Sequence, residues 1–497
     1  MSTRTVEFDD IQGLLRFGYK HQTQASFLLL QVKDREAARV WLASVPVSSA
    51  ITAEPPPDTA LQLALSRDGL QALGVADDIV NAFSPEFVSG LGRDASQSRR
   101  LGDVGANAPE YWQWGAGQRV PHVLVLLYAR PGRLAAFQQA VEAQVASGFD
   151  ILVRLATSDL DGIEPFGFVD GISQPRLDWD RTRAARDQEQ LAYNNLSCLG
   201  EYLLGYPNEY GGYTDRPLLD PQRDPQALLP RAEDVPTQAD LGRNGSYLVL
   251  RQLRQDVHGF WQFVNEQVGG DAAERERLAA VMVGRTRQGQ PVVKSAGDAN
   301  AGNDVNAFDY QADPQGVRCP LGAHVRRANP RNADLPSGGP ALFSWLKRTL
   351  GFDAQARERD RVASTRFHRM LRRGREYGAP VSIDQALSGA ASPSDTGLHF
   401  LCLGASLARQ FEFVQSAWMA STRFDGLRNE SDPLLGTREP AADGSPTNEF
   451  SMPQPGGPDR RVCGLPQFVT VLGGAYFFLP GIRALRYLAS TRSLGSP

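Results

Sequence analysis

The sequence predicts an α+β protein built from two ferredoxin-like halves. Strand and helix patterns follow one another in the order β-α-β-β-α-β twice along the chain, which is the order of a ferredoxin-like unit. The chain has 497 residues, enough for two or more domains. Its 41% hydrophobic and 22% charged residues are typical of a globular protein.

The first half opens with a strand and a helix. Residues 25–32 (ASFLLLQV) form an apolar run of strand length, and apolar side chains recur at helical spacing over 34–45. The other elements predicted here are a strand at 59–66, short helical pieces across 67–91, a strand at 121–128, a helix over 131–147 that begins at Pro131 and a strand at 149–156.

The second half repeats this order with a long insertion. Residues 206–243 are crowded with Pro, Gly, Asp and Arg, which predicts a crossing loop. The elements predicted after it are strands at 246–253, 367–373, 398–403 and 468–478 and helices at 256–267 and 407–422, with loops at 285–318 and 428–466. We therefore expect an N-terminal domain over 1–215, a linker over 216–243 and a C-terminal domain over 244–497.

Composition and charge exclude several classes of function. The net charge is −4 and no basic block offsets it, which argues against a nucleic-acid partner. No apolar run reaches the ~18 residues of a membrane span, and the N-terminus has no apolar signal core, so we expect a cytoplasmic protein without a membrane anchor. The four cysteines lie far apart and form no C-x-x-C pair, which predicts neither a zinc site nor a disulfide framework.

The first candidate for chemistry is Asp170, in the stretch EPFGFVDGISQPR at 164–176. A bare Asp-Gly pair is usually a turn, and that interpretation stays open. The flanking glycines permit a tight turn and the close approach of a bulky group, while Phe166, Phe168 and Val169 surround the acid with apolar side chains. We therefore expect a buried carboxyl that can move protons.

Of the six histidines, His324 has the most unusual surroundings. It lies in CPLGAHVRRANPR, with Arg326, Arg327 and Arg331 close behind it. A lone histidine is usually a polar core or surface residue, and that remains the alternative. The arginines favour a ligand role, because an imidazole that binds a metal inside an anionic macrocycle needs cations for the propionates. No second His or Cys lies at metal-ligand spacing, which argues against a bare zinc or non-haem iron site.

Two further stretches contain charged residues in unusual places. In RMLRRGREYGAP (369–380), an arginine on a strand that runs into a Gly turn can point inward and stabilise a developing anion, although a solvated basic edge strand explains the pattern as well. In GASLARQFEFVQSAW (404–418), Glu412 lies among apolar residues of a predicted buried helix, where an unpaired carboxylate is costly. An imidazole N–H is one partner that would satisfy it.

Together these motifs resemble the dye-decolourising peroxidases, haem enzymes built from two ferredoxin-like domains. The resemblance covers nearly the whole chain and rests on DIQGLLRFGY, GFVDGISQP, EYLLGYPNEYG, NGSYLVLRQLRQDVHGFW, CPLGAHVRRANPR, RRGREYG, RQFEFVQ and TVLGGAYFFLP. The G-x-x-D-G motif alone is weak. The three motifs G-x-x-D-G, A-H-x-R-x-x-N-P-R and R-R-G-x-x-Y-G, found in this order along the chain, are together a specific signature of the family.

The resemblance implies a dimeric α+β barrel type of fold, with haem b held mainly by the C-terminal domain. It places the distal acid at Asp170 and the proximal iron ligand at His324. The distal arginine falls on Arg372, although the adjacent Arg373 leaves that choice open. The other haem contacts that it implies are Gly171, Arg331 beside a propionate, Glu412 behind the proximal histidine, and Leu401 and Leu403 over the distal face.

The implied activity is a haem peroxidase reaction that consumes hydrogen peroxide and oxidises aromatic donors such as dyes and phenolics. Asp170 would move a proton between the peroxide oxygens, Arg372 would stabilise the developing charge, and one-electron donors would reduce the ferryl haem that results. An aspartate as the distal acid predicts higher activity at acidic pH. The sequence is compatible with a monomer or a homo-oligomer.

Other interpretations stay open. The long stretch between His324 and Arg372 resembles that of the longer, fungal-like members. Trp345, Tyr377 and Trp418 are candidates for a surface relay of electrons, although most aromatic residues belong to the core. The alternative function is haem binding or iron handling, with peroxidase activity incidental. The tail STRSLGSP would suit cargo of a protein shell, and ordinary fraying of the C-terminus explains it equally.

Overall fold

The structure is a computed structural model that describes residues 5–182, 196–294, 305–331, 365–388, 395–441 and 443–490. Helices and antiparallel strands are mixed along these ranges, and the predicted α+β class is confirmed. None of the helices in these ranges is long and apolar enough to cross a bilayer.

The first half folds in the predicted order. Its main elements are β1 (Gln24–Val32), α1 (Arg35–Ser44), β2 (Thr59–Leu65), β3 (Val123–Ala129), α6 (Leu134–Val145) and β4 (Phe149–Ala156). Four short helices follow β2, namely α2 (Arg67–Ala72), α3 (Asp77–Val80), α4 (Pro85–Ser89) and α5 (Ala95–Leu101). Helix α1 begins after Asp34, because the Asp34 side chain accepts a hydrogen bond from the Ala37 N–H.

The second half repeats the order around a longer insertion. Its strands are β9 (Ser246–Gln255), β10 (Leu371–Arg372), β11 (Arg375–Tyr377), β12 (Gly397–Gly404) and β15 (Val469–Leu479). Its helices are α7 (Val257–Gln267), α8 (Ala272–Val283), α9 (His324–Ala328), α12 (Ile383–Leu387) and α13 (Ile482–Ser490). The predicted helix at 407–422 is π-helical over Ala408–Glu412 and Val414–Ala420.

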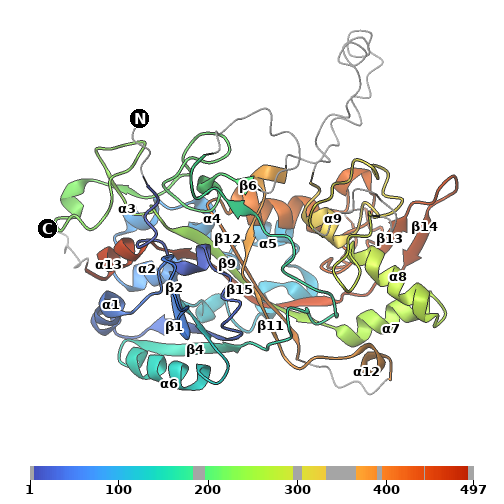
Figure 1. The fold of residues 1–497 in the computed structure, drawn as a ribbon, viewed down its shortest axis with the longest axis horizontal. Coiled ribbons are helices and arrows are strands. Elements are labelled where there is room, and N and C mark those ends of the chain that lie inside the picture. Colours follow the sequence, from blue (N-terminus) through green and yellow to red (C-terminus); the bar gives the residue numbers. More distant parts are fainter. Residues whose placement is uncertain are drawn as a thin grey trace, which may run out of the picture.

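One antiparallel sheet joins the two halves. Its strand order is β10-β12-β9-β15-β2-β3-β1-β4, with β11 also paired to β12. Each half therefore has the strand order of a ferredoxin-like unit, and β15 meets β2 where Phe478 pairs with Leu65. The central strands β1, β2, β3 and β15 are almost wholly buried because core side chains cover both faces of the sheet, whereas the edge strand β4 is partly exposed. Figure 1 shows β1 and β4 at the left and α7 and α8 at the right.

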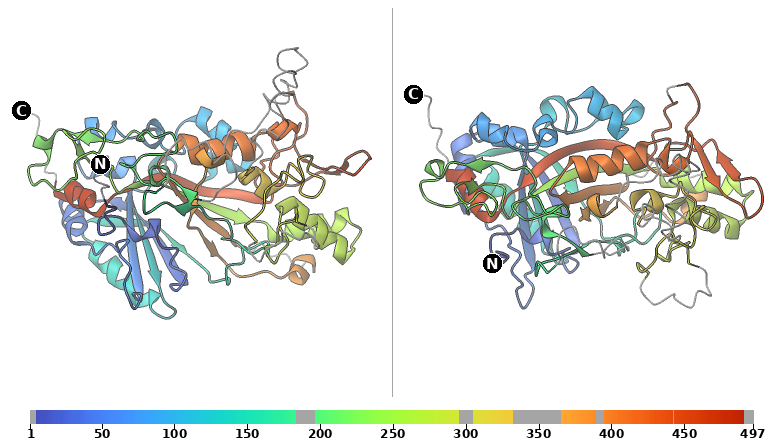
Figure 2. Two further views of the ribbon diagram at one scale, coloured as in Figure 1. Left: turned by 45° about the horizontal axis from the view of Figure 1, so that its top comes forward. Right: turned by 90° about the horizontal axis from the view of Figure 1, so that it is seen from above.

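Some predicted boundaries are wrong. The strand predicted at 367–373 is reduced to β10, and a tight helical turn over Thr365–Phe367 precedes it. The region 428–466, predicted as a loop, contains the hairpin β13 (Glu449–Met452) and β14 (Arg460–Cys463). Short strand pairs also lie outside the main sheet, namely β5 (Arg176–Leu177) with β6 (Leu196–Ser197) and β7 (Leu218–Leu219) with β8 (Ala239–Asp240). Figure 2 shows the π-helical segment (orange) running alongside β15 (red).

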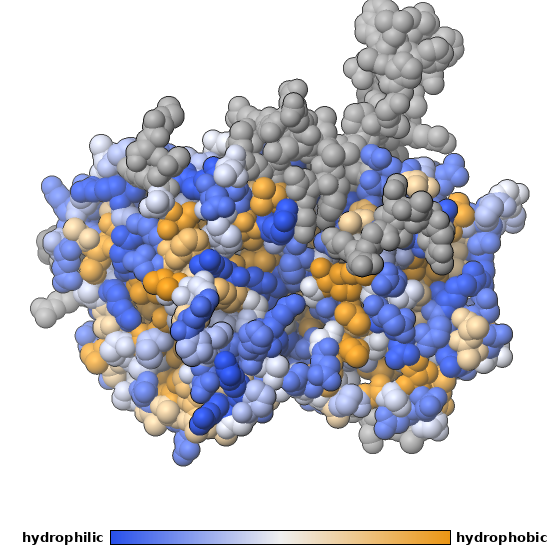
Figure 3. All heavy atoms as spheres, viewed as in Figure 1, coloured by the Kyte–Doolittle hydropathy of each residue, from blue (hydrophilic) through white to orange (hydrophobic). Residues whose placement is uncertain are grey.

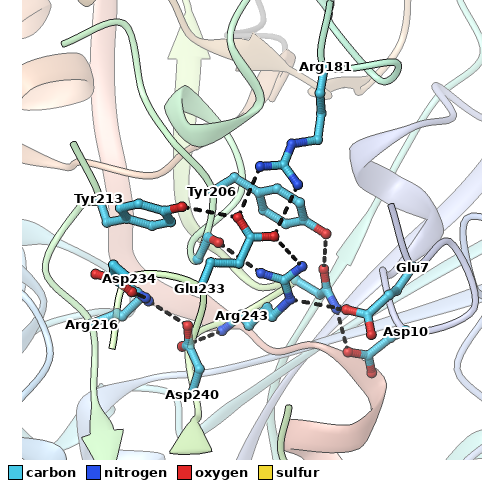
Figure 4. Close-up of polar contacts among 12 residues, drawn as sticks. Glu7, Asp10, Arg181, Tyr206, Tyr213, Arg216, Glu233, Asp234, Asp240 and Arg243 are labelled. Atoms are coloured by element: carbon cyan, nitrogen blue, oxygen red, sulfur yellow. Dashed lines mark hydrogen bonds and ion pairs between the residues drawn. The ribbon is translucent and has the colours of Figure 1, made fainter. Parts of the chain in front are cut away.

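The predicted crossing loop is held by a buried ionic network, shown in Figure 4. Arg243 is central to it: its guanidinium donates to Glu7 at 3.1 Å, to Glu233 at 3.0 Å and to the Gly205 carbonyl at 3.0 Å. Burial raises the pKa of Glu7, but hydrogen bonds from Asn244 and from arginines including Arg243 lower it to about 2. The network thus ties 205–243 to the N-terminal segment, and the linker is packed rather than loose.

The surface around the second half is partly apolar. The space-filling view of Figure 3 shows apolar side chains (orange) in small groups on both halves of this face, among hydrophilic neighbours. Of the second half, α7, α8, α9 and the strands β13 and β14 lie on the right of Figure 1, whereas α13 lies at the left.

Candidate active site

A large cavity lies in the second half, next to the segment 164–176. Its apolar lining residues are Phe166, Phe168, Val169, Ile172, Pro175, Leu253, Val283, Val325, Ala328, Met370, Leu398, Phe400, Phe411, Val414, Trp418, Met419, Leu434, Leu435 and Val469. Its ionisable lining residues are Glu164, Asp170, Arg285, His324, Arg331, His368, Arg369 and Arg372. We call it the His324 cavity. Apolar walls with a few converging polar groups are typical of small-molecule and cofactor sites.

Asp170 lines this cavity, at a tight bend of the chain. Its backbone N–H donates to the Gly162 carbonyl at 3.0 Å, and the next residue, Gly171, has a φ of +73°, which favours glycine. The expected burial of Asp170 is wrong, because its side chain is 38% exposed. The apolar neighbours predicted it to be enclosed, whereas they form the walls of an open cavity with the acid at its edge. Gly171 is not among the residues that line the cavity.

Arg372 lies beside Asp170, and Arg373 does not. The Arg372 Nη1 atom is 3.7 Å from Asp170 Oδ1, and Nη2 donates to the Ser173 carbonyl at 3.0 Å. Adjacent strand residues point to opposite faces of a sheet. Arg373 accordingly donates through Nε to the Leu14 carbonyl at 2.9 Å, and burial lowers its pKa to about 10. The choice that the sequence left open therefore falls on Arg372.

His324 is the first residue of α9, and an acid from a distant part of the chain holds its ring. The Nδ1 atom lies 3.1 Å from Oδ2 and 3.2 Å from Oδ1 of Asp432, whose side chain is fully buried. Asp432 Oδ1 also accepts from the Leu434 and Leu435 N–H groups at 2.9 and 2.7 Å. Burial lowers the pKa of His324, but the Asp432 carboxylate outweighs burial and the pKa is raised overall. With Nδ1 engaged, Nε2 is the ring nitrogen suited to bind a ligand.

The prediction that Glu412 stands behind His324 is wrong. Glu412 accepts hydrogen bonds from Gln97 on α5 and from the Tyr476 hydroxyl on β15, the latter at 2.9 Å. The carboxylate does need partners, as the sequence indicated, but they come from two other elements. The resemblance placed Glu412 behind the histidine, whereas the structure gives that position to Asp432, which lies outside this helix.

The assignment of Leu401 and Leu403 to the cavity is also wrong. Both are fully buried in the core on the other face of the sheet. Because side chains alternate along a strand, the residues of β12 that line the cavity are Leu398 and Phe400. Every second residue of a strand shares a face, so one known cavity-facing residue of β12 would have identified the others.

Arg331 also lines the cavity, and its predicted position beside a propionate stays a prediction. Its guanidinium lies 3.7 Å from the centre of the Phe308 ring and donates to the Asn306 and Phe308 carbonyls at 3.0 and 2.7 Å. Arg331 also has a φ of +56°. A bulky residue in that conformation is uncommon, and local contacts hold it there.

Glu164 is an acid that the sequence interpretation did not single out. Its carboxylate accepts from the Phe166 and Phe168 N–H groups, both at 3.0 Å, and from Gln255 Nε2 at 2.8 Å. It therefore closes the loop that leads to Asp170 and ties that loop to β9. Burial raises the pKa of Glu164 to about 7. In the sequence, a glutamate directly before the apolar run PFGF is the pattern that could have indicated a buried, loop-closing carboxylate here.

The predicted surface relay residues are not on the surface where the structure describes them. Tyr377 and Trp418 are buried, at 6% and 3% exposure. Trp418 lines the cavity and packs edge to face with His368, their ring centres 5.3 Å apart. Trp345 and the tail beyond Ser490 lie outside the described residues.

Comparison with known proteins points to one family. No family model matches the chain. A multifunctional dye peroxidase of Amycolatopsis sp. is 29% identical over 444 residues, which cover 86% of this chain and 82% of the relative. A dye-decolorizing peroxidase of Auricularia auricula-judae is 26% identical over 526 residues, or 98% of this chain and 87% of the relative.

Solved structures show the same fold over the whole length. A dye-decolorizing peroxidase in complex with 2,6-dimethoxyphenol has a TM-score of 0.71 at 25% identity and covers 98% of this chain and 100% of its own. The chain fits the family of dye-decolourising peroxidases. A fungal peroxidase of this type from Auricularia auricula-judae reaches a TM-score of 0.72 at 24% identity. The protein is accordingly a peroxidase, and the ferredoxin-like α+β fold of dye-decolourising peroxidases is confirmed for it.

Proposed function

We propose that the protein is a haem peroxidase that binds haem b in the His324 cavity and uses hydrogen peroxide to oxidise aromatic donors in one-electron steps. The observation that carries this proposal is the convergence of His324, Asp170 and Arg372 on one mostly apolar cavity. These residues come from α9, the 164–176 segment and β10, which are far apart in the sequence.

The side chains around the cavity fit a haem. His324 offers Nε2 as an iron ligand, while the Asp432 carboxylate fixes the tautomer and makes the imidazole more electron-donating. The apolar walls suit the porphyrin, and arginines such as Arg331 suit its anionic propionates. Bound haem would supply the iron redox centre that accepts oxidising equivalents from peroxide and passes them on singly.

Asp170 is the proposed proton carrier of the peroxide step. Its carboxylate takes the proton from one peroxide oxygen and returns it to the other as the O–O bond breaks, help worth about a hundred- to ten-thousand-fold in rate. Arg372 is 3.7 Å away and has a fixed positive charge, which stabilises the negative charge that develops on the departing oxygen. The Ser173 carbonyl holds the Arg372 guanidinium in place.

The substitution Asp170→Ala tests the peroxidase proposal against simple haem carriage. A peroxidase variant should keep its Soret band and lose at least roughly a hundredfold of its rate with hydrogen peroxide. If the loss is below about tenfold, Asp170 is not the proton carrier. If the wild-type protein binds haem and turns over no aromatic donor with peroxide, a haem-binding or iron-handling role replaces the proposal.

A further inference from the structure

A second cavity adjoins the His324 cavity and is not used by the peroxide reaction. We call it the Asp103 cavity. It lies between α5, the second half of the sheet and the segment 436–441, and it opens at the exposed residues Arg99, Glu439 and Pro440. Much of its wall is apolar, including Val104, Leu435 and Val471. It therefore has a route to solvent separate from the Asp170 segment.

A buried ion pair lies in this wall. Asp103 and Arg251 are 2% and 3% exposed and form a close salt bridge through Asp103 Oδ1 and Arg251 Nη2. Within the described residues, the other carboxylate oxygen of Asp103, Oδ2, is buried and has no hydrogen-bond partner. An unpaired buried oxygen is costly, so a ligand that donates a hydrogen bond would be favoured here. Burial raises the pKa of Asp103, which makes it a better proton acceptor.

Two phenyl rings form part of the wall between the cavities, to which Leu253, Gln415, Leu435 and Val469 also contribute. Phe400 and Phe411 line both cavities, and their ring centres are 6.4 Å apart. The Arg251 guanidinium lies 6.0 Å from the centre of the Phe411 ring. A molecule in the Asp103 cavity is therefore one side-chain layer away from a group in the His324 cavity. Aromatic rings pack well against such a wall in offset or edge-to-face arrangements.

We propose that the Asp103 cavity binds a small phenol, with its hydroxyl donated to Asp103 Oδ2 and its ring against Phe400 and Phe411. An apolar site with one buried acceptor matches an aromatic ring that has one hydroxyl donor. The oxidation of the bound phenol rests on the proposed peroxidase function, whereas its binding does not. Each bound phenol gives one electron to the peroxide-oxidised cofactor and its O–H proton to Asp103. Two phenols and one hydrogen peroxide then yield two phenoxyl radicals and two waters.

Binding tests the proposal without relying on turnover. The haem-loaded enzyme, with cyanide on its iron, is dialysed to equilibrium against 4-fluorophenol. Thr437 lines the Asp103 cavity and is absent from the His324 cavity, so Thr437→Phe fills only the former. Its matched control is Thr437→Val, which also removes the hydroxyl and leaves the space open. We expect one phenol per chain for the wild type and Thr437→Val, and at least roughly tenfold weaker binding for Thr437→Phe.

Two further variants keep the result interpretable. Val104→Phe fills the same cavity from another segment, and Asp103→Asn removes the anionic acceptor; each should weaken phenol binding by roughly tenfold or more. The KM for the phenol should rise in Thr437→Phe and stay near the wild-type value in Thr437→Val. Binding to Thr437→Phe and Val104→Phe within about twofold of Thr437→Val overturns the inference. Phenol binding without peroxide-dependent turnover in the wild type would instead overturn the proposed function and leave the binding site standing.

Discussion

The Nδ1 atom of His324 lies 3.1 Å from the Oδ2 atom of Asp432, a carboxylate that is completely buried. Two backbone N–H groups, from Leu434 and Leu435, fix the same carboxylate. Although burial raises the pKa of Asp432, the His324 imidazole outweighs burial and lowers it overall, so the acid stays ionised beside the ring. The orientation and the electron-donating strength of the proposed iron ligand are thus set by Asp432.

Replacing Asp432 by asparagine should change the properties of the iron without removing it. The substitution Asp432→Asn keeps the shape and removes the negative charge, so the imidazole donates less electron density. We expect the Fe(III)/Fe(II) midpoint potential to rise by roughly 60 mV or more, which for one electron corresponds to ~1.4 kcal/mol. Spectroelectrochemistry of the haem-loaded protein measures this.

Glu412→Gln is the matched control for Asp432→Asn. Glu412 bonds to Gln97 and Tyr476, so its neutralisation should leave the potential within about 20 mV of wild type. An equal shift in both variants would show that the effect is general electrostatics and not the bond to His324.

Substitutions of Arg372, the last residue of β10, and of its neighbour Arg373 should have different effects. Arg372→Gln should lower the rate with hydrogen peroxide by about a hundred- to a thousandfold, because the fixed charge beside Asp170 is lost. Arg373→Gln should leave that rate nearly unchanged and lower the melting temperature, because it loses the bond to the Leu14 carbonyl. Stopped-flow spectroscopy and thermal unfolding separate the two; reversed effects would contradict the assignment.

Glu164 should make stability depend on pH. Its folded pKa of about 7 is raised from 4.5, so the stability it contributes is complete below pH 4.5 and is lost as pH rises through 7. At about 1.4 kcal/mol per pKa unit, the loss is on the order of 3 kcal/mol. Glu164→Gln should flatten the fall in melting temperature over this range. Glu36→Gln, at a side chain 81% exposed, should retain it; a retained slope in Glu164→Gln would refute the role.

The ionic network of Figure 4 should be costly to break. Arg243→Met removes the buried guanidinium that Glu7 and Glu233 share, and it leaves Glu7 with Asn244 and Arg483 and Glu233 with Arg181. We expect a loss of about 3 kcal/mol in unfolding free energy. The partly exposed pair of Arg154 and Glu142 offers the comparison: Arg154→Met should cost about 1 kcal/mol or less. Urea unfolding compares the two, and equal losses would contradict a central role for Arg243.

The sequence predicted the fold well because its strands carry strong local signals. Runs such as 25–32 and 121–128 became β1 and β3 with boundaries shifted by two residues or fewer. Weak signals failed: β10 has two residues, and its pairing with β12 depends on contacts distant in sequence. No local pattern encodes such pairing.

The site was predicted less completely, because its contacts depend on which distant segments of the chain meet in the fold. Asp170, His324 and Arg372 stand in distinctive motifs, whereas Asp432 stands in a plain NESDPLL turn and meets His324 only through tertiary packing. Glu412 looked suitable because a buried carboxylate needs a partner, and the sequence could not say which partner. Leu401 and Leu403 were assigned by the resemblance alone, and in a strand a shift of one residue moves a side chain to the other face.

The central claim is that His324 holds haem iron in a cavity where Asp170 handles peroxide. One absorbance experiment tests it: spectra of haem-reconstituted wild type, His324→Ala and Asp170→Asn are recorded before and after one equivalent of hydrogen peroxide. The wild type should show a Soret band that changes on addition, Asp170→Asn the same band that barely changes, and His324→Ala a band diminished or shifted beforehand. A His324→Ala protein with a wild-type Soret band and a wild-type response to peroxide would contradict the account.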